Sequence, residues 1–136
     1  MRIMVCGPIG SKGIHKIKKM SAFLTKNGFE ISSQLDQGRM DYSKICDFRT
    51  RKNLSRSIVK HDLKMVKDSD VLVVLSTPSF GAAMEMFFAK ELGKKTVLFS
   101  ENPMPSPWPV NFADFITKDK KSLLATLNTI RNKKEH

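Results

Sequence analysis

In Val71-Leu-Val-Val-Leu-Ser-Thr-Pro-Ser-Phe-Gly-Ala-Ala-Met-Glu85, the sequence carries its strongest indication of a fold. The first five residues of this stretch, 71–75, are apolar and mostly β-branched, which predicts a buried strand. A helical pattern follows, from near Gly81 to Gly93. Because ligands in an open α/β sheet bind outside the carboxyl ends of the strands, we expect residues 76–85 to form the floor of a binding site.

Glu85 is the residue of this stretch that most suggests chemistry. We expect it in the first turn of the helix, among the apolar side chains of residues 82–84 and 86–88. An ionised carboxylate has little to solvate it in such surroundings. Glu85 is therefore a candidate functional residue.

The N-terminal part has the same succession of strand, loop and helix. Residues 2–6 predict a first strand, and residues 14–26 predict an amphipathic helix that ends at Asn27-Gly28. The loop between them consists of Gly7, Pro8, Ile9, Gly10, Ser11, Lys12 and Gly13. Its backbone can approach a ligand closely, so it is a candidate cradle for a phosphate or a sugar, and an ordinary tight turn explains it equally well. The loop matches neither the dinucleotide-binding nor the Walker pattern.

A long polar segment separates the second strand from the next helix. Residues 29–33 predict a strand, residues 34–53 show no clear period and carry charges of both signs, and residues 54–69 predict a helix. About twenty residues without regular structure in a compact domain usually form a functional lid or a mobile loop. We interpret residues 34–53 as a lid.

An acid interrupts the apolar face of the helix predicted over residues 54–69. The series at every fourth position is Leu54, Ile58, Asp62 and Val66. One explanation is that Asp62 pairs with Arg56 or Lys60, or caps a neighbouring loop. Another follows from geometry, because Asp62 lies eight residues before the strand and hence about 12 Å along an antiparallel helix. That distance brings it to the upper part of the sheet, near Glu85.

The C-terminal part completes the predicted sheet. Residues 95–99 predict a fourth strand and residues 112–116 a short fifth one, and an amphipathic helix follows around Leu123. Between these strands, Asn102-Pro-Met-Pro-Ser-Pro-Trp-Pro109 predicts a stiff, extended loop. Its Trp108 either stacks on a base or fills a hydrophobic gap.

Length and composition limit the classes of protein to consider. A chain of 136 residues predicts one domain over residues 1–136. Its two cysteines and three histidines lack metal-ligand spacing, so we expect no disulfide framework, no metal site and no cofactor. No apolar run reaches the roughly 18 residues that cross a bilayer, and the N-terminus lacks the core of a signal peptide. We expect a cytoplasmic protein without a membrane partner.

The chain is strongly basic, with 24 Lys and Arg against 13 Asp and Glu and a formal net charge of +11. Such a surplus attracts nucleic acid, nucleotides and phosphorylated metabolites alike. The basic residues are spread along the chain and do not alternate with aromatic ones, as a surface that stacks single strands requires. We therefore do not expect nucleic acid to be the biological partner.

Two carboxylates converging below a glycine-rich loop suggest chemistry on a sugar. Glycosidic cleavage passes through an oxocarbenium-like transition state, which one carboxylate stabilises or traps while a second acid protonates the leaving group. Two acids can carry out this reaction without a metal or a redox group. Glu85 and Asp62 are the candidate pair.

Three motifs of the sequence are Ile3-Met-Val-Cys-Gly-Pro-Ile9, then His61-Asp62-Leu63 eight residues before Asp70-Val-Leu-Val, and Ser79-Phe-Gly-Ala-Ala-Met-Glu85. Together they resemble the nucleoside 2-deoxyribosyltransferase family, and most closely its 2'-deoxynucleoside 5'-monophosphate N-glycosidase branch. The motifs occur in order and at the right spacing. The resemblance extends from Arg2 to the last helix.

This resemblance implies a flavodoxin-like or Rossmann-like three-layer α/β fold with a five-stranded parallel sheet. It also implies that Glu85 is the nucleophile at the anomeric carbon and that Asp62 is the acid or base serving the nucleobase and the water. Gly7 to Gly10 would surround the sugar and phosphate, with Ser79 and Gly81 at the 5'-phosphate.

The resemblance further implies a homodimer in which the neighbouring subunit completes the site. Apolar side chains on all sides of the third predicted helix fit burial at such an interface. Monophosphate-specific relatives carry an arginine at the position of Gly10, so Lys12 or an arginine of the lid is expected to supply that charge. Asn111 and Ser106 lie near the place of a serine that the partner donates in those relatives, and we take Asn111 as a candidate substrate-binding residue.

The sequence thus predicts a hydrolase that cleaves the N-glycosidic bond of a nucleoside 5'-monophosphate through a covalent intermediate on Glu85. A transferase that passes the sugar to another base is the nearest alternative. A nucleotide-binding or nucleic-acid-binding module without turnover is the alternative from another class.

Overall fold

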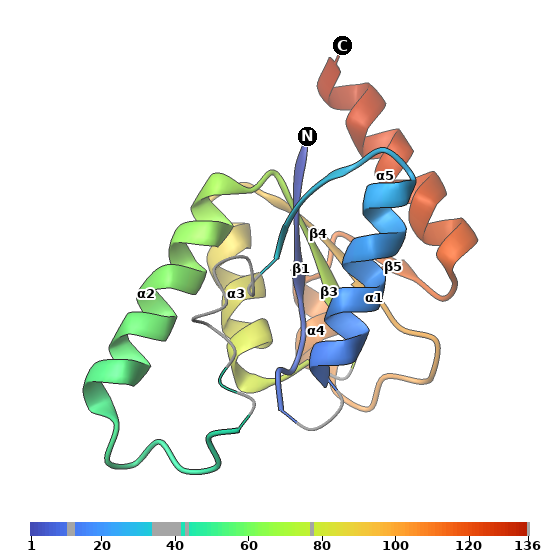
Figure 1. Cartoon of the computed structure of the whole chain (residues 1–136). Coiled ribbons are helices and arrows are strands. Elements are labelled where there is room, and N and C mark those ends of the chain that lie inside the picture. The colour runs from blue at the N-terminus through green and yellow to red at the C-terminus, as the bar shows by residue number, and fades with distance from the viewer. Residues whose placement is uncertain (11–12, 34–41, 43, 77, 136) are drawn as a thin grey trace.

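The structure is a computed structural model of the chain and describes residues 1–10, 13–33, 42, 44–76 and 78–135. Strands and helices alternate along these residues (Figure 1). The elements are β1 (Arg2–Cys6), α1 (Gly13–Lys26), β2 (Glu30–Ser33), α2 (Lys52–Asp68), β3 (Val71–Leu75), α3 (Phe80–Glu91), β4 (Lys95–Phe99), α4 (Pro107–Phe112), β5 (Phe115–Thr117) and α5 (Lys120–Glu135).

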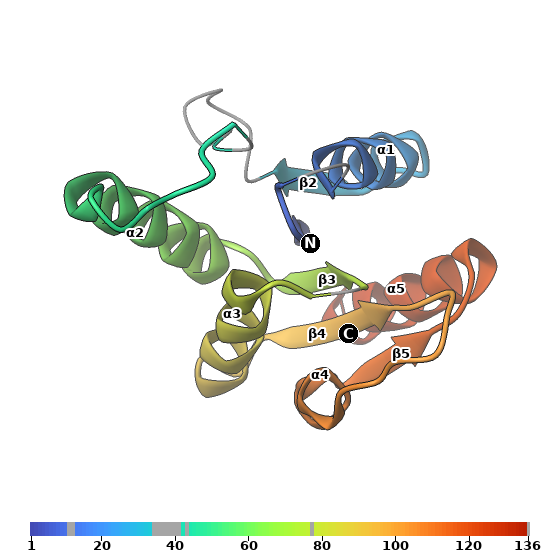
Figure 2. The ribbon, with the colours of Figure 1, turned by 90° about the horizontal axis from the view of Figure 1, so that it is seen from below.

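The strands form one parallel sheet in the order β2-β1-β3-β4-β5. Figure 2 shows α1 and α5 on one side of this sheet and α2 and α3 on the other, which makes three layers. The strand order is that of flavodoxin-like folds. The predicted α/β fold with a five-stranded parallel sheet is therefore confirmed.

The chain reverses its direction of winding between β1 and β3. It passes from β1 outward to β2, and from β3 outward to β4 on the opposite side. Cys6, the last residue of β1, lies opposite Val74 of β3 in the register. At such a switch point the two connecting loops separate and leave a crevice beyond the carboxyl ends of the strands. The residues that follow Cys6 and Leu75 lie at this switch point.

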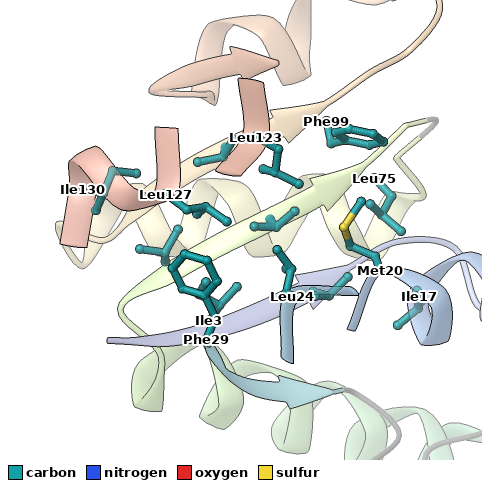
Figure 3. Close-up of a cluster of buried hydrophobic side chains, with 14 of the residues drawn as sticks. Ile3, Ile17, Met20, Leu24, Phe29, Leu75, Phe99, Leu123, Leu127 and Ile130 are labelled. Carbon is teal, nitrogen blue, oxygen red and sulfur yellow. The ribbon is translucent and has the colours of Figure 1, made fainter. Parts of the chain in front are cut away.

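The two faces of the central strands belong to two hydrophobic clusters. Alternate residues of β1 and β3 point to opposite faces of the sheet, as in any strand. One cluster lies under α1 and α5, and Figure 3 shows part of it, from Ile3 and Leu24 to Phe99. The other cluster lies under α2 and α3 and contains Met4, Cys6 and Met86. Cys6 thus points to the side of the sheet that carries α3.

The predicted helix and strand limits agree with the structure to within two residues for most elements. The helix predicted over residues 54–69 is α2, and the strand predicted over residues 29–33 is β2. Residues 34–41 and 43 of the predicted lid lie outside the described residues. Residues 42 and 44–51 form neither a helix nor a strand.

The prediction failed at the proline-rich stretch before the fifth strand. The end of the predicted extended loop is helical, because α4 spans Pro107–Phe112. Ser106 caps this helix, accepting a hydrogen bond from the backbone N–H of Trp108 at 3.3 Å, and Pro107 occupies a first-turn position that needs no N–H. The fifth strand is therefore Phe115–Thr117, and Phe112 belongs to the helix.

Gly13, the first residue of α1, allows a close approach of two backbone segments. A Cβ placed at this position would lie 1.9 Å from the carbonyl oxygen of Pro8, whereas a Cβ at Gly10 would meet nothing within 4 Å. We therefore expect Gly13→Ala to lower the free energy of unfolding by about 1–3 kcal/mol or more. Gly10→Ala, the matched control, should change it by less than about 0.5 kcal/mol. Urea denaturation measures both, and equal midpoints for the two variants would contradict the described loop.

Candidate active site

Glu85 lies on the buried face of α3. The helix begins at Phe80, so Glu85 is its sixth residue and stands in the second turn, not in the first turn as predicted. Ser79 fixes the start of the helix, because its hydroxyl oxygen accepts a hydrogen bond from the backbone N–H of Ala82 at 3.2 Å. Glu85 shares its face with Ala82 and Ala89, which pack on the sheet, and it is only 4% exposed.

The thiol of Cys6 contacts the carboxylate of Glu85. Cys6 is fully buried at the end of β1 and donates a hydrogen bond to Glu85. Burial raises the pKa of the Cys6 thiol well above its usual value, and the charges of Glu85 and Asp62 raise it further. The thiol is therefore a neutral donor at physiological pH. It holds one side of the Glu85 carboxylate against the end of the sheet.

Asp62 is buried on the inward face of α2, as its place in the apolar series predicted. Among the described residues its contact is with His61, whose Nδ1 lies 3.3 Å from Asp62 Oδ1. Burial raises the pKa of Asp62, and the contact with His61 partly opposes this effect. The structure does not show the pairing with Arg56 or Lys60 that was one explanation of this acid.

Tyr42, one of the described residues of the predicted lid, lies in the same region as Asp62 and Glu85. Its pKa is raised to about 12, first by burial and then by the charges of Asp62 and Glu85. The ring also packs edge to face on Phe48, with ring centroids 5.7 Å apart. The tyrosine thus stays protonated, and its hydroxyl lies within the electrostatic influence of the two acids.

Glu85 and Asp62 lie in the same region of the structure, since the charges of both act on the Cys6 thiol and the Tyr42 phenol. The two acids come from different helices, α3 and α2, which pack side by side on one face of the sheet (Figure 2). Both are at least nine-tenths buried. The structure therefore brings together the two carboxylates that the sequence singled out.

Gly81 leaves space next to the Glu85 carboxylate. A Cβ at this position would lie 4.0 Å from Glu85 Oε1 and 3.9 Å from the hydroxyl oxygen of Ser79. A larger side chain here would cover the carboxylate. Gly81 and Ser79 thus border the buried acid at the start of α3.

The loop after β1 borders the crevice from the other side. Gly7 and Ile9 are buried, Pro8 is half-buried and Gly10 is exposed. A Cβ at Gly7 would touch the Cβ of Leu75 at 3.4 Å, so the loop lies against the end of β3. Lys12, the predicted source of positive charge, lies outside the described residues.

Asn111 lies on α4, away from the loop after β1. Its side chain is exposed, and α4 packs on α3. Trp108 of the same helix is 68% exposed and stacks on Phe112, with ring centroids 6.4 Å apart. Trp108 therefore fills no gap inside this chain, which was one of its two predicted roles.

Three residues of this cluster were missed by sequence reasoning. Cys6 was read only as the end of a strand, His61 was considered as one of three histidines without metal-ligand spacing and as part of a motif, and Tyr42 lay in a segment without a clear pattern. The imidazole of His61 nevertheless reaches the carboxylate beside it. Tyr42 is the only tyrosine of the chain, and its occurrence in a polar segment was the one available signal.

The described residues contain no group of three His, Cys, Asp or Glu side chains that could hold a metal ion. Within the same residues, no helix combines the length and the apolar character that a membrane span needs. The chemistry that the site itself offers is that of two buried acids. One can attack an electrophilic carbon, and the other, with its raised pKa, can donate a proton.

No family model and no curated protein matches this sequence. Several solved structures resemble it in fold, including the following two. A 2-deoxyribosyltransferase from the psychrotolerant bacterium Bacillus psychrosaccharolyticus matches with a TM-score of 0.66 and 16% identity, over 90% of this chain and 90% of that one. The CMP N-glycosidase of Clostridium botulinum matches with a TM-score of 0.58 and 17% identity, over 94% of this chain and 99% of that one. The chain therefore has the fold of these enzymes over nearly its whole length, in agreement with the resemblance of the three motifs.

Proposed function

We propose that this protein hydrolyses the N-glycosidic bond of a nucleoside or deoxynucleoside 5'-monophosphate, releasing the nucleobase and the sugar 5-phosphate. The observation that carries the proposal is the pair of buried acids, Glu85 and Asp62, beside the switch point of the sheet. Glycoside cleavage needs two such acids. The fold shared with a 2-deoxyribosyltransferase and a CMP N-glycosidase supports the substrate class.

In the first step, a carboxylate oxygen of Glu85 attacks C1' of the sugar. The bond between C1' and the base nitrogen breaks, and its electron pair stays with the base, which takes a proton from Asp62. The products are a glycosyl ester on Glu85 and the neutral base. The raised pKa of Asp62 favours its protonated form and thereby this role.

In the second step, water attacks C1' of the ester. Asp62, now a carboxylate, accepts a proton of the water, and the bond between C1' and the Glu85 oxygen breaks with its electron pair returning to Glu85. The sugar 5-phosphate is then free to leave. The hydrogen bond from Cys6 orients the Glu85 carboxylate for both steps. Neither step requires a cofactor.

The substrate-binding residues form part of the same proposal. The loop from Gly7 to Gly10 contacts the sugar and phosphate, and Ser79 and Gly81 bind the 5'-phosphate at the start of α3. The open position of Gly81 beside Glu85 supports this placement. Lys12 supplies positive charge, and Asn111 contributes from α4 of a second copy of the chain.

The test is a chromatographic screen of the purified protein. Each ribo- and deoxyribonucleoside 5'-monophosphate and each parent nucleoside is incubated with it, and the free base is measured. We expect free base and sugar 5-phosphate from at least one monophosphate, and less or none from its nucleoside. Release of no base from any of these compounds would contradict the proposal.

A deoxyribosyltransferase is the second candidate function, because a 2-deoxyribosyltransferase shares this fold with a TM-score of 0.66. The two functions differ in whether water or a second base resolves the ester on Glu85. Adding a free acceptor base to the same reactions separates them. A new nucleoside or nucleotide would establish the transferase, whereas sugar 5-phosphate alone would establish the hydrolase.

We further propose that the site is completed by a second copy of the chain. The apolar patch that supports this contains Ala83, Met84, Phe87, Trp108 and Phe112. These residues border a hollow of about 490 Å³ between α3 and α4, and Met84 is 71% exposed. Large exposed apolar patches are typical of interfaces. Part of this patch lies on α3, the helix that carries Glu85.

We expect the wild-type protein to sediment as a dimer and the double variant Met84→Glu/Phe87→Glu to sediment as a monomer with greatly reduced activity, because four carboxylates would face one another in the interface. Ile116→Glu is the control, since Ile116 is half exposed on β5 and outside the patch. A monomeric wild-type protein, or a double variant that remains dimeric, would contradict this proposal.

A further inference from the structure

A second pocket lies on the other side of the sheet from Glu85. It has a volume of about 300 Å³ and opens between the first half of α1, the start of α5 and the loop after β4. We call it the lysine pocket and define it by Lys16, Lys19, Lys120, Met20, Phe99 and Asn102. A volume of this size is enough for a small ligand.

The lysine pocket is separate from the two carboxylates. Its floor is formed by Met20, Leu75 and Phe99, which belong to the cluster under α1 and α5 (Figure 3). Cys6, the partner of Glu85, belongs to the cluster on the opposite face. The floor of the lysine pocket and the Cys6–Glu85 pair thus belong to opposite faces of the sheet, and Ser76, which follows β3 at the switch point, also lines the lysine pocket.

The rim of the pocket is positively charged. Lys16, Lys19 and Lys120 line it together with a single carboxylate, that of Glu101. The surface around the pocket is also positively charged, because α1 contains four lysines and no acidic residue. In a concave site with an apolar floor, such an excess of one charge concentrates anions.

A hydrogen bond and two prolines restrict the loop after β4, which forms one wall of the pocket. Ser100 donates a hydrogen bond of 2.6 Å to the carbonyl oxygen of Asn102, and Pro103 and Pro105 restrict the backbone that follows. On the rim, the ammonium group of Lys120 lies 4.9 Å from the centre of the Phe23 ring. The pocket therefore needs little rearrangement to accept a ligand.

We propose that the lysine pocket binds a small phosphorylated molecule with a flat aromatic ring. The ring would lie on Met20 and Phe99, and the phosphate would lie between Lys16, Lys19 and Lys120. Lysine ammonium groups are suited to a phosphate as point charges, and the pocket is both apolar at its floor and basic at its rim. This inference does not depend on the proposed glycosidase activity, since it uses none of the residues around Glu85.

Pyridoxal 5'-phosphate is a probe with both features, and it reports which lysine it meets. Its aldehyde condenses with a lysine amine to give an imine and water, and borohydride then delivers hydride to the imine carbon, leaving a stable secondary amine. The labelled lysines are identified by mass spectrometry of peptides. At less than one equivalent of probe, we expect the label to concentrate on Lys16, Lys19 and Lys120 and to fall when inorganic phosphate is added. Labelling spread over all exposed lysines would overturn the proposal.

A pair of matched variants separates a built site from a merely basic surface. Lys16→Met/Lys19→Met removes two charges from the pocket, whereas Lys18→Met/Lys26→Met removes two exposed charges from the same helix outside it. We expect the first to weaken reversible binding of pyridoxal 5'-phosphate at least about tenfold, and the second by less than about twofold. Equal weakening by both would show that only the general charge of the surface attracts the probe.

Discussion

The Glu85→Gln variant is expected to lose base release by about a thousandfold or more. The amide has nearly the shape of the carboxylate but cannot form the ester with C1'. Because Glu85 is 4% exposed and hydrogen bonded to Cys6, the change removes a buried charge without creating a cavity. The loss should therefore appear in the rate and not in the stability of the fold. It is measured as the initial rate of base release on the best substrate of the screen.

Glu91→Gln is the matched control for this variant. Glu91 is the last residue of the same helix and is exposed, so its neutralisation should leave the rate within about twofold. Thermal unfolding of both variants shows whether the fold is intact. A folded Glu85→Gln variant that keeps a tenth or more of the wild-type rate would exclude Glu85 as the nucleophile.

The second large effect is expected at Asp62. Asp62→Asn should lower the rate of base release by about 10²–10⁴-fold, the usual contribution of a general acid. The wild-type enzyme should also lose kcat/KM as the pH rises, because only the protonated form of Asp62 can donate. Since burial raises the pKa of Asp62, this loss should occur at a higher pH than for an exposed aspartate.

In the Asp62→Asn variant, the alkaline decline that belongs to Asp62 should be absent. Asp68→Asn is the control, because Asp68 lies exposed on the same helix and is paired with Lys64 at 3.2 Å. It should leave both the rate and the pH profile close to those of the wild type. An unchanged alkaline decline in Asp62→Asn would show that another group supplies the proton.

Most of the fold could be predicted from the sequence, because its signals are strong and local. The run of residues 71–75 is apolar on both sides, and the structure buries it between two layers of helices. The interrupted apolar face of α2 was equally informative. Burying an acid in an apolar series costs free energy of folding, so such an acid indicates a partner or a function. That single irregularity led to Asp62, which the structure places near Glu85.

The errors in the fold have a clear physical cause. Prolines at alternate positions indicated an extended chain, but a serine followed by proline is also a good start for a helix. The cap by Ser106 decided between the two. The start of α3 is a similar case, since Ser79 caps the helix two residues before the glycine that seemed to begin it.

The rest of the site depends on contacts between distant parts of the chain. Cys6 contacts Glu85 only because β1 and β3 are neighbours, and Tyr42 is influenced by the charges of two acids that are distant from it in the sequence. No local sequence pattern predicts such long-range interactions. The lysine pocket is likewise invisible in the sequence, where Lys16, Lys19 and Lys120 are three basic residues among many.

The ester between Glu85 and the sugar is the central intermediate of the proposed mechanism. A 2'-fluorinated analogue of the best nucleoside monophosphate slows the oxocarbenium-like steps, so the ester should accumulate. After an acid quench, peptide mass spectrometry should show that the peptide containing Glu85 has gained the fluorosugar phosphate in stoichiometric amount as the base is released. Release of the base without this gain, or a gain on another residue, would contradict the account.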